Sequence, residues 1–272
     1  MRSITDADID SLVGNFLPVD SALFRVLLSA TSEQLHGDLA EMGVLYGASA
    51  ILIGSYLQPG ETFTVIDLFG GSELDDANAE ENSQYYPGLT RQAFEANYRR
   101  FHDTLPVVVQ DLSSAIVNHA THGTHRFVHI DASHLYEHVA PDIANARLLL
   151  KPDGIVALDD YRSPHTPGVS AAAWQAVFEQ GLKPFLLSEH KMYATWGDTS
   201  AWTSAVETWL ADSDYTVDRQ VINGHPVLRI ISPRPRPAHP IKRFIPEVAW
   251  PVLAYANRLR RRVLSSPPEG SA

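Results

Sequence analysis

The chain has no cysteine among its 272 residues. This absence excludes disulfide bonds, thiolate catalysis and cysteine-ligated zinc sites, and it is typical of the reducing cytoplasm, where we expect this protein to reside. Long apolar runs are also missing, because no segment approaches the ~20 apolar residues of a membrane span. The first residues are acidic and contain no apolar core, so we expect neither a signal peptide nor a membrane span.

Positive charge is scarce except in one region. Residues 233–272 hold eight basic and two acidic residues, a net charge of +6, which leaves −17 on the remainder of a chain whose total is −11. An acidic remainder argues against a nucleic-acid partner. We predict an N-terminal helical segment over 1–35, a central domain over 36–232, and a Pro/Arg-rich linker with a basic helix over 233–272. The basic part is predicted to contact the acidic part or a second copy in a homodimer.

Strands and helices alternate along the central domain. This alternation predicts an α/β fold with a doubly wound, mostly parallel, seven-stranded sheet, flanked by an N-terminal helix and a C-terminal basic extension. The polar, acidic segment 70–88 has no periodicity and is predicted to be a functional loop. The seven predicted strands cover residues 39–42, 62–69, 106–111, 127–131, 155–159, 191–196 and 226–232.

Acidic side chains follow two neighbouring predicted strands. Asp131 ends one strand, and Asp159 and Asp160 end the next. A βαβ connection places the carboxyl ends of such strands side by side, where open α/β sheets bind ligands. Together with His134, these carboxylates are typical of a hard divalent cation site with a base beside it. For any single aspartate, capping of the next helix or turn remains the alternative. Neighbouring residues of a strand point to opposite faces, so Asp159 and Asp160 can reach one ion only if the strand ends there.

A second group of residues lies at the ends of the first three predicted strands. Glu41-x-Gly43-x-x-x-Gly47 joins the first strand to a helix, Asp67 ends the second strand, and Asp111 ends the third. Glycines permit a tight turn and a close ligand, and an acid after the second strand can accept hydrogen bonds from ribose hydroxyls. The nicotinamide fingerprint Gly-x-Gly-x-x-Gly is absent, which favours a nucleoside cofactor without a pyrophosphate. Close packing without a ligand is the alternative for the glycines.

This succession of motifs resembles a known family. The segments GDLAEMGVLYGAS, VIDLF, VVVQDLSS, FVHIDASHLYEHVAPDI and LKPDGIVALDDY are similar to those of class I S-adenosylmethionine-dependent methyltransferases, over about residues 36–182. Within this class the chain most resembles the metal-dependent sugar O-methyltransferases of the macrocin and mycinamicin type. A likeness to mycobacterial methylmannose-polysaccharide methyltransferases is a further hypothesis.

The resemblance implies an S-adenosylmethionine- and Mg²⁺- (or Mn²⁺-) dependent O-methyltransferase acting on a sugar hydroxyl of a glycoside or oligosaccharide. It implies a catalytic base, His134, beside Asp131. The implied cofactor residues are Glu41, Gly43, Gly47, Asp67 and Asp111, and the implied metal ligands are Asp131, Asp159 and Asp160. A catechol or phenol acceptor, a metal-dependent hydrolase and a non-catalytic binding module remain alternatives.

Other polar and aromatic residues nearby allow more than one interpretation. His165 is the rival to His134 as the base, because it lies in a Pro-flanked loop after the aspartate pair. His129 is interpreted as a core residue with satisfied hydrogen bonds. For Tyr136 and Tyr161, stacking on a sugar ring and packing within the protein are equally favoured.

Overall fold

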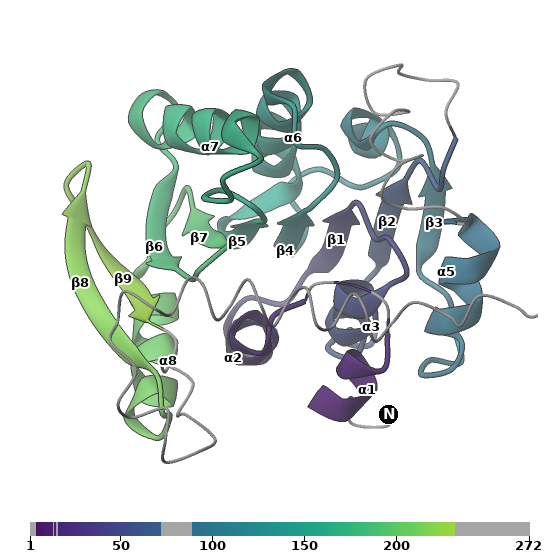
Figure 1. Cartoon of the computed structure of the whole chain (residues 1–272), viewed down its shortest axis with the longest axis horizontal. Coiled ribbons are helices and arrows are strands. Elements are labelled where there is room, and N and C mark those ends of the chain that lie inside the picture. Colours follow the sequence, from purple (N-terminus) through teal and green to yellow (C-terminus); the bar gives the residue numbers. More distant parts are fainter. Residues whose placement is uncertain (1–3, 13, 15, 72–88, 232–272) are drawn as a thin grey trace, which may run out of the picture. The chain divides into compact units, whose positions relative to one another are not determined.

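The computed structural model describes residues 4–12, 14, 16–71 and 89–231 (Figure 1). The predicted loop from residue 72 to 88 and the predicted basic segment 233–272 lie outside the described residues. The strands are β1 (Asp38–Met42), β2 (Phe63–Asp67), β3 (Val107–Gln110), β4 (His125–Ile130), β5 (Leu150–Leu158), β6 (Lys183–Leu187), β7 (Met192–Thr195), β8 (Thr216–Ile222) and β9 (His225–Ile231).

These strands form one mixed sheet in the order β3-β2-β1-β4-β5-β7-β6-β9-β8. The first five run parallel, as expected for strands joined by helical crossovers. β7 pairs antiparallel with both β5 and β6, and β8 pairs antiparallel with β9. The Rossmann-like α/β prediction is confirmed. The prediction of seven strands was wrong, because the sheet has nine strands among the described residues.

Two strands, β6 and β8, were not predicted because their sequences lack the features expected of sheet strands. β6 contains Pro184, a residue that removes a ladder donor and is atypical of an inner strand. β8 carries Asp218, Arg219 and Gln220 in its middle, and Val221 is 74% exposed. This strand lies at the edge of the sheet and is held by its hairpin with β9, so its sequence shows little of the apolar pattern that predicts strands.

Helices cover both faces of the sheet (Figure 1). One hydrophobic core includes residues of α2 and α3, and the other includes residues of α6 and α7. The connection between β3 and β4 contains the short 3-10 helix η1. No helix among the described residues is long and apolar enough to cross a membrane. The helices are α1 (Asp6–Asp10), α2 (Pro18–Gln34), α3 (Ala48–Gly54), α5 (Arg91–Tyr98), η1 (Ser113–Asn118), α6 (Tyr136–Leu149), α7 (Pro167–Glu179) and α8 (Ser200–Ala211).

Backbone hydrogen bonds tie the carboxyl ends of the central strands together. The Asp131 amide donates to Met42 at the end of β1 over 2.8 Å, and the Asp159 amide donates to Ile130 at the end of β4 over 3.0 Å. The Gly43 amide donates to Ile66 of β2 over 2.8 Å. The residues predicted for a site therefore follow adjacent strands along one edge of the sheet.

Candidate active site

The turn between β1 and α3 contains both predicted glycines, and each has a positive φ. Gly43 has φ +81°, and a Cβ atom there would lie 2.1 Å from the carbonyl oxygen of Asp131. Gly47 has φ +96°, and its Cβ would lie 3.1 Å from the ring of Phe94. Both conformations favour glycine. Packing within the protein already requires glycine at these positions, so the pair does not by itself indicate a ligand.

The Asp67 carboxylate holds this turn in place. Its Oδ2 accepts hydrogen bonds from the amides of Val44 (2.7 Å) and Leu45 (3.2 Å), and its Oδ1 accepts one from the amide of Phe69 (2.7 Å). Burial raises the pKa of Asp67, and the three amide donors oppose that rise. A ribose would thus meet a carboxylate whose position is fixed by the turn. Asp111, after β3, accepts a hydrogen bond from the amide of Leu112 over 2.7 Å.

Asp67→Ala should weaken the binding of S-adenosylhomocysteine by about one to two decades, because charge-assisted hydrogen bonds of this kind are worth ~1.5–3 kcal/mol. Titration calorimetry measures the affinity, and thermal unfolding confirms that the variant is folded. The matched control is Asp38→Ala, at the start of β1. The Asp38 carboxylate also accepts from backbone and side-chain donors, Thr62 and Thr124, each over 2.7 Å. The control should keep its affinity, and an unchanged affinity for Asp67→Ala would remove that residue from the site.

Glu41 lies beneath the turn and is fully buried. Its Oε1 accepts a hydrogen bond from the Ser49 hydroxyl at 2.5 Å and lies 2.7 Å from Nδ1 of His129. Its Oε2 is one of the buried side-chain oxygens that have no hydrogen-bond partner among the described residues. An unpaired buried carboxylate oxygen is costly, and this one fits a donor from a ligand.

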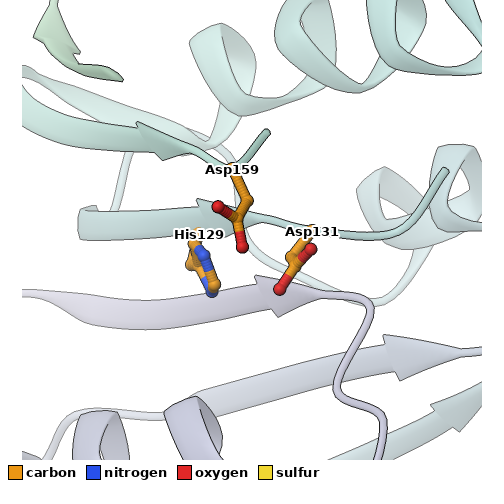
Figure 2. Close-up of side chains that lie close together, drawn as sticks. All are labelled: His129, Asp131 and Asp159. Carbon is orange, nitrogen blue, oxygen red and sulfur yellow. The ribbon is translucent and has the colours of Figure 1, made fainter. Parts of the chain in front are cut away.

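The other half of the candidate site lies at the ends of β4 and β5. His129, Asp131 and Asp159 present ligand-type atoms that all lie within 4.8 Å of one another (Figure 2). Partial desolvation and the charges of Asp159 and Asp160 raise the pKa of Asp131 well above its usual range. Asp131 and Asp159 therefore lie together, whereas Asp160 is not a member of this group and His129 stands in its place.

Asp160 turns away from Asp159 because the strand has ended. β5 stops at Leu158, and Asp160 has φ +54°, which redirects the chain. Its Oδ2 lies 3.3 Å from Nε2 of His134, and its Oδ1 accepts a hydrogen bond from the Ser163 hydroxyl. Burial raises the pKa of Asp160, but these two partners lower it below its usual value. The rings of His134 and His165 are 5.7 Å apart between centroids, so both candidate bases lie near Asp160.

Lys191 is a residue of this site that the sequence analysis missed. It directly precedes β7, and its ammonium contacts Asp159 and lies 3.0 Å from Nε2 of His129. No local signal distinguished it, since a lysine at the start of a strand is usually exposed. His129 is fully buried with a partner for each ring nitrogen, as the core interpretation expected.

The two tyrosines differ in exposure. Tyr161 is 1% exposed and packs against Trp174, with ring centroids 6.0 Å apart, so it serves packing. Tyr136 is 37% exposed, and its hydroxyl donates to Gln175 over 2.6 Å. Tyr136 is thus the tyrosine that has an accessible surface for a ligand.

The chain resembles known methyltransferases in a family model and in its fold. A family model described as a methyltransferase domain matches residues 40–161. The O-methyltransferase NovP has a TM-score of 0.53 and 19% identity, over 66% of this chain and 81% of NovP. The calicheamicin methyltransferase CalS11 has a TM-score of 0.47 and 19% identity, over 71% of this chain and 88% of its own. An O-methyltransferase from Bacillus cereus, in complex with SAH, has a TM-score of 0.47 and 14% identity, over 70% and 91%.

The comparison with curated proteins found no match. At these identities the likeness to solved structures concerns the fold alone. Residues 40–161 thus match the methyltransferase-domain model, and the chain shares its fold with NovP.

Proposed function

We propose that this protein is an S-adenosylmethionine-dependent O-methyltransferase that uses a divalent cation to methylate a sugar hydroxyl of a glycoside or oligosaccharide. The observation that supports it is the order of residues along one sheet edge. Asp111, Asp67 and Gly43 follow β3, β2 and β1, and Asp131 and Asp159 follow the adjacent β4 and β5. A methyl donor on the first three strands would lie next to an acceptor on the last two.

The residues present fit the methyl donor. The orphaned Oε2 of Glu41 suits the methionine ammonium, Asp67 suits the ribose, and Asp111 suits the adenine. S-adenosylmethionine supplies the methyl group as a sulfonium electrophile. The protein must then hold the donor in line with the acceptor oxygen. The turn between β1 and α3, which is held by Asp67, would fix the position of the donor.

The aspartates fit a divalent cation, because carboxylate oxygens are the ligands that Mg²⁺ and Mn²⁺ prefer. The carboxylates that could hold it are those of Asp131, Asp159 and Asp160. A cation held there would supply the positive charge that lowers the pKa of the acceptor hydroxyl. His134 accepts the hydroxyl proton as general base, and Asp160, 3.3 Å from its Nε2, orients the ring and stabilises its protonated form.

The sugar acceptor is the finer part of the proposal. It is supported by the likeness of Asp131-x-x-His134 with Asp159-Asp160 to the sugar O-methyltransferases. A phenolic acceptor would use the same cation and base. The homodimer and the cytoplasmic location are likewise proposals, and sedimentation velocity of the full chain tests the first.

The test is a methyl-transfer screen with labelled S-adenosylmethionine and Mg²⁺, over mono- and oligosaccharides, methylmannose oligomers and catechols. We expect label to appear on a saccharide, to disappear with EDTA and to return with Mg²⁺ or Mn²⁺. Label on a catechol alone would overturn the sugar assignment. Activity that persists in EDTA would overturn the role of the cation and return the three aspartates to turn and capping roles.

A further inference from the structure

The cation-binding half of the site already contains a cation that belongs to the chain. The side chain of Lys191 is 3% exposed, and its ammonium contacts Asp159 and lies 3.0 Å from Nε2 of His129. A buried ammonium is costly unless charged and polar partners surround it. Lys191 therefore has a defined position rather than a flexible one.

The surroundings suit a charged ammonium, because the Asp159 carboxylate contacts it directly. The rings of Phe16 and Phe24, with centroids 5.7 Å and 5.8 Å from the ammonium, add cation–π attraction.

The hydrogen bonds of His129 agree with this position. Its Nδ1 lies 2.7 Å from Oε1 of Glu41, which as a carboxylate can only accept. The proton of the neutral ring is therefore on Nδ1, and the lone pair of Nε2 faces Lys191, which can only donate. Two members of the group His129, Asp131 and Asp159 thus already have their lone pairs directed at the ammonium.

We propose that Lys191 is the resident cation of His129 and Asp159, so that a divalent ion beside these strand ends would be bound by Asp131 and not by Asp159. The second half rests on the proposed function. Asp131 is the member of the group His129, Asp131 and Asp159 that does not contact Lys191, so its carboxylate is the one left for another cation.

The test measures Mn²⁺ affinity in the absence of any acceptor, by electron paramagnetic resonance of the free ion. Lys191→Met should bind Mn²⁺ at least about tenfold more tightly than wild type, because Asp159 and His129 lose their internal cation and become available. Lys183→Met, a lysine whose ammonium donates to the Gly197 carbonyl over 2.9 Å, is the matched control and should not change the affinity.

A double variant removes both charges of the Lys191–Asp159 ion pair at once. Lys191→Met/Asp159→Asn keeps the local charge balance, so its Mn²⁺ affinity should stay within about threefold of wild type, whereas Asp131→Asn should lose at least about tenfold. Thermal unfolding confirms that each variant is folded. A tenfold loss in the double variant, or weaker binding in Lys191→Met, would overturn the inference, because Asp159 would then be a ligand.

The outcomes separate this inference from the proposed function. Mn²⁺ binding by Lys191→Met but not by wild type would support Lys191 as the resident cation and count against a metal in the reaction. No Mn²⁺ binding by either protein would overturn the inference, while methyl transfer by wild type in the screen would still support a methyltransferase.

Discussion

His134→Ala should lower methyl transfer by about 10²–10⁴-fold while leaving the affinities for S-adenosylhomocysteine and Mn²⁺ unchanged, because a positioned general base is worth that much. His134 lies beside Asp160, so we expect its loss to affect proton transfer and not donor binding. In wild type the rate should rise with pH as the base loses its proton, and the variant should lose this limb of the pH profile.

Two further variants make the assignment of the base specific. His165→Ala tests the rival, whose ring centroid is 5.7 Å from that of His134. His122→Ala, an exposed histidine near the end of η1, is the matched control and should keep the wild-type rate and pH profile. Full activity in His134→Ala together with loss of activity in His165→Ala would transfer the role of base to His165.

Asp142→Asn should make the protein more stable at neutral and alkaline pH. Asp142 lies on the face of α6 that includes the core residues Val139, Ile143 and Ala146, and it is fully buried. Its carboxylate oxygens are buried without a hydrogen bond of normal geometry to any described residue. Burial raises the pKa of Asp142 to about 7, and the Ser113 side chain offsets only part of that rise. An aspartate in the unfolded chain titrates near ~3.9, so the folded protein keeps a proton there that the unfolded chain has already released.

The sign follows from this difference in bound protons. The stability from the protonated carboxyl is fully present below pH ~4, falls by about 1.4 kcal/mol per pH unit, and is lost above pH ~7, a total on the order of 4 kcal/mol. Asparagine cannot ionise, so Asp142→Asn avoids this loss. Urea unfolding at pH 5, 6, 7 and 8 should show the variant gaining on wild type as pH rises. Asp212→Asn, at an exposed position, should not do so. A difference that is constant with pH would contradict the buried, protonated carboxyl.

The sequence predicted the parts of the fold in which local pattern and tertiary environment agree. β2 is buried and appears as a nearly continuous apolar run, and α7 begins with Pro167 and is followed by Gly181, which has φ +73°. β8 could not be recognised in this way, because its exposed edge position tolerates charged residues. The parallel arrangement of β4 and β5 also followed from the sequence, since the helix between them requires a crossover.

The candidate site was predictable only where its residues follow a strand. Asp67, Asp131 and Asp159 could be placed because the ends of parallel strands share an edge. Lys191 could not, because it reaches Asp159 and His129 from a hairpin that the prediction lacked: without β6, the turn before β7 had no defined position. The burial of Asp142 could not be predicted either, since a polar residue in a helix is normally assigned to the exposed face.

The contact between Gly43 and Asp131 sets the spacing between the two halves of the site. The turn that would hold the methyl donor lies directly against the backbone of the residue that begins the acceptor side, with no room for a single added carbon atom. Distances fixed by main chain against main chain do not adjust as side chains do. Under the proposed function, a different acceptor would have to be accommodated by the side chains around it, because this main-chain contact fixes the interval between donor and acceptor.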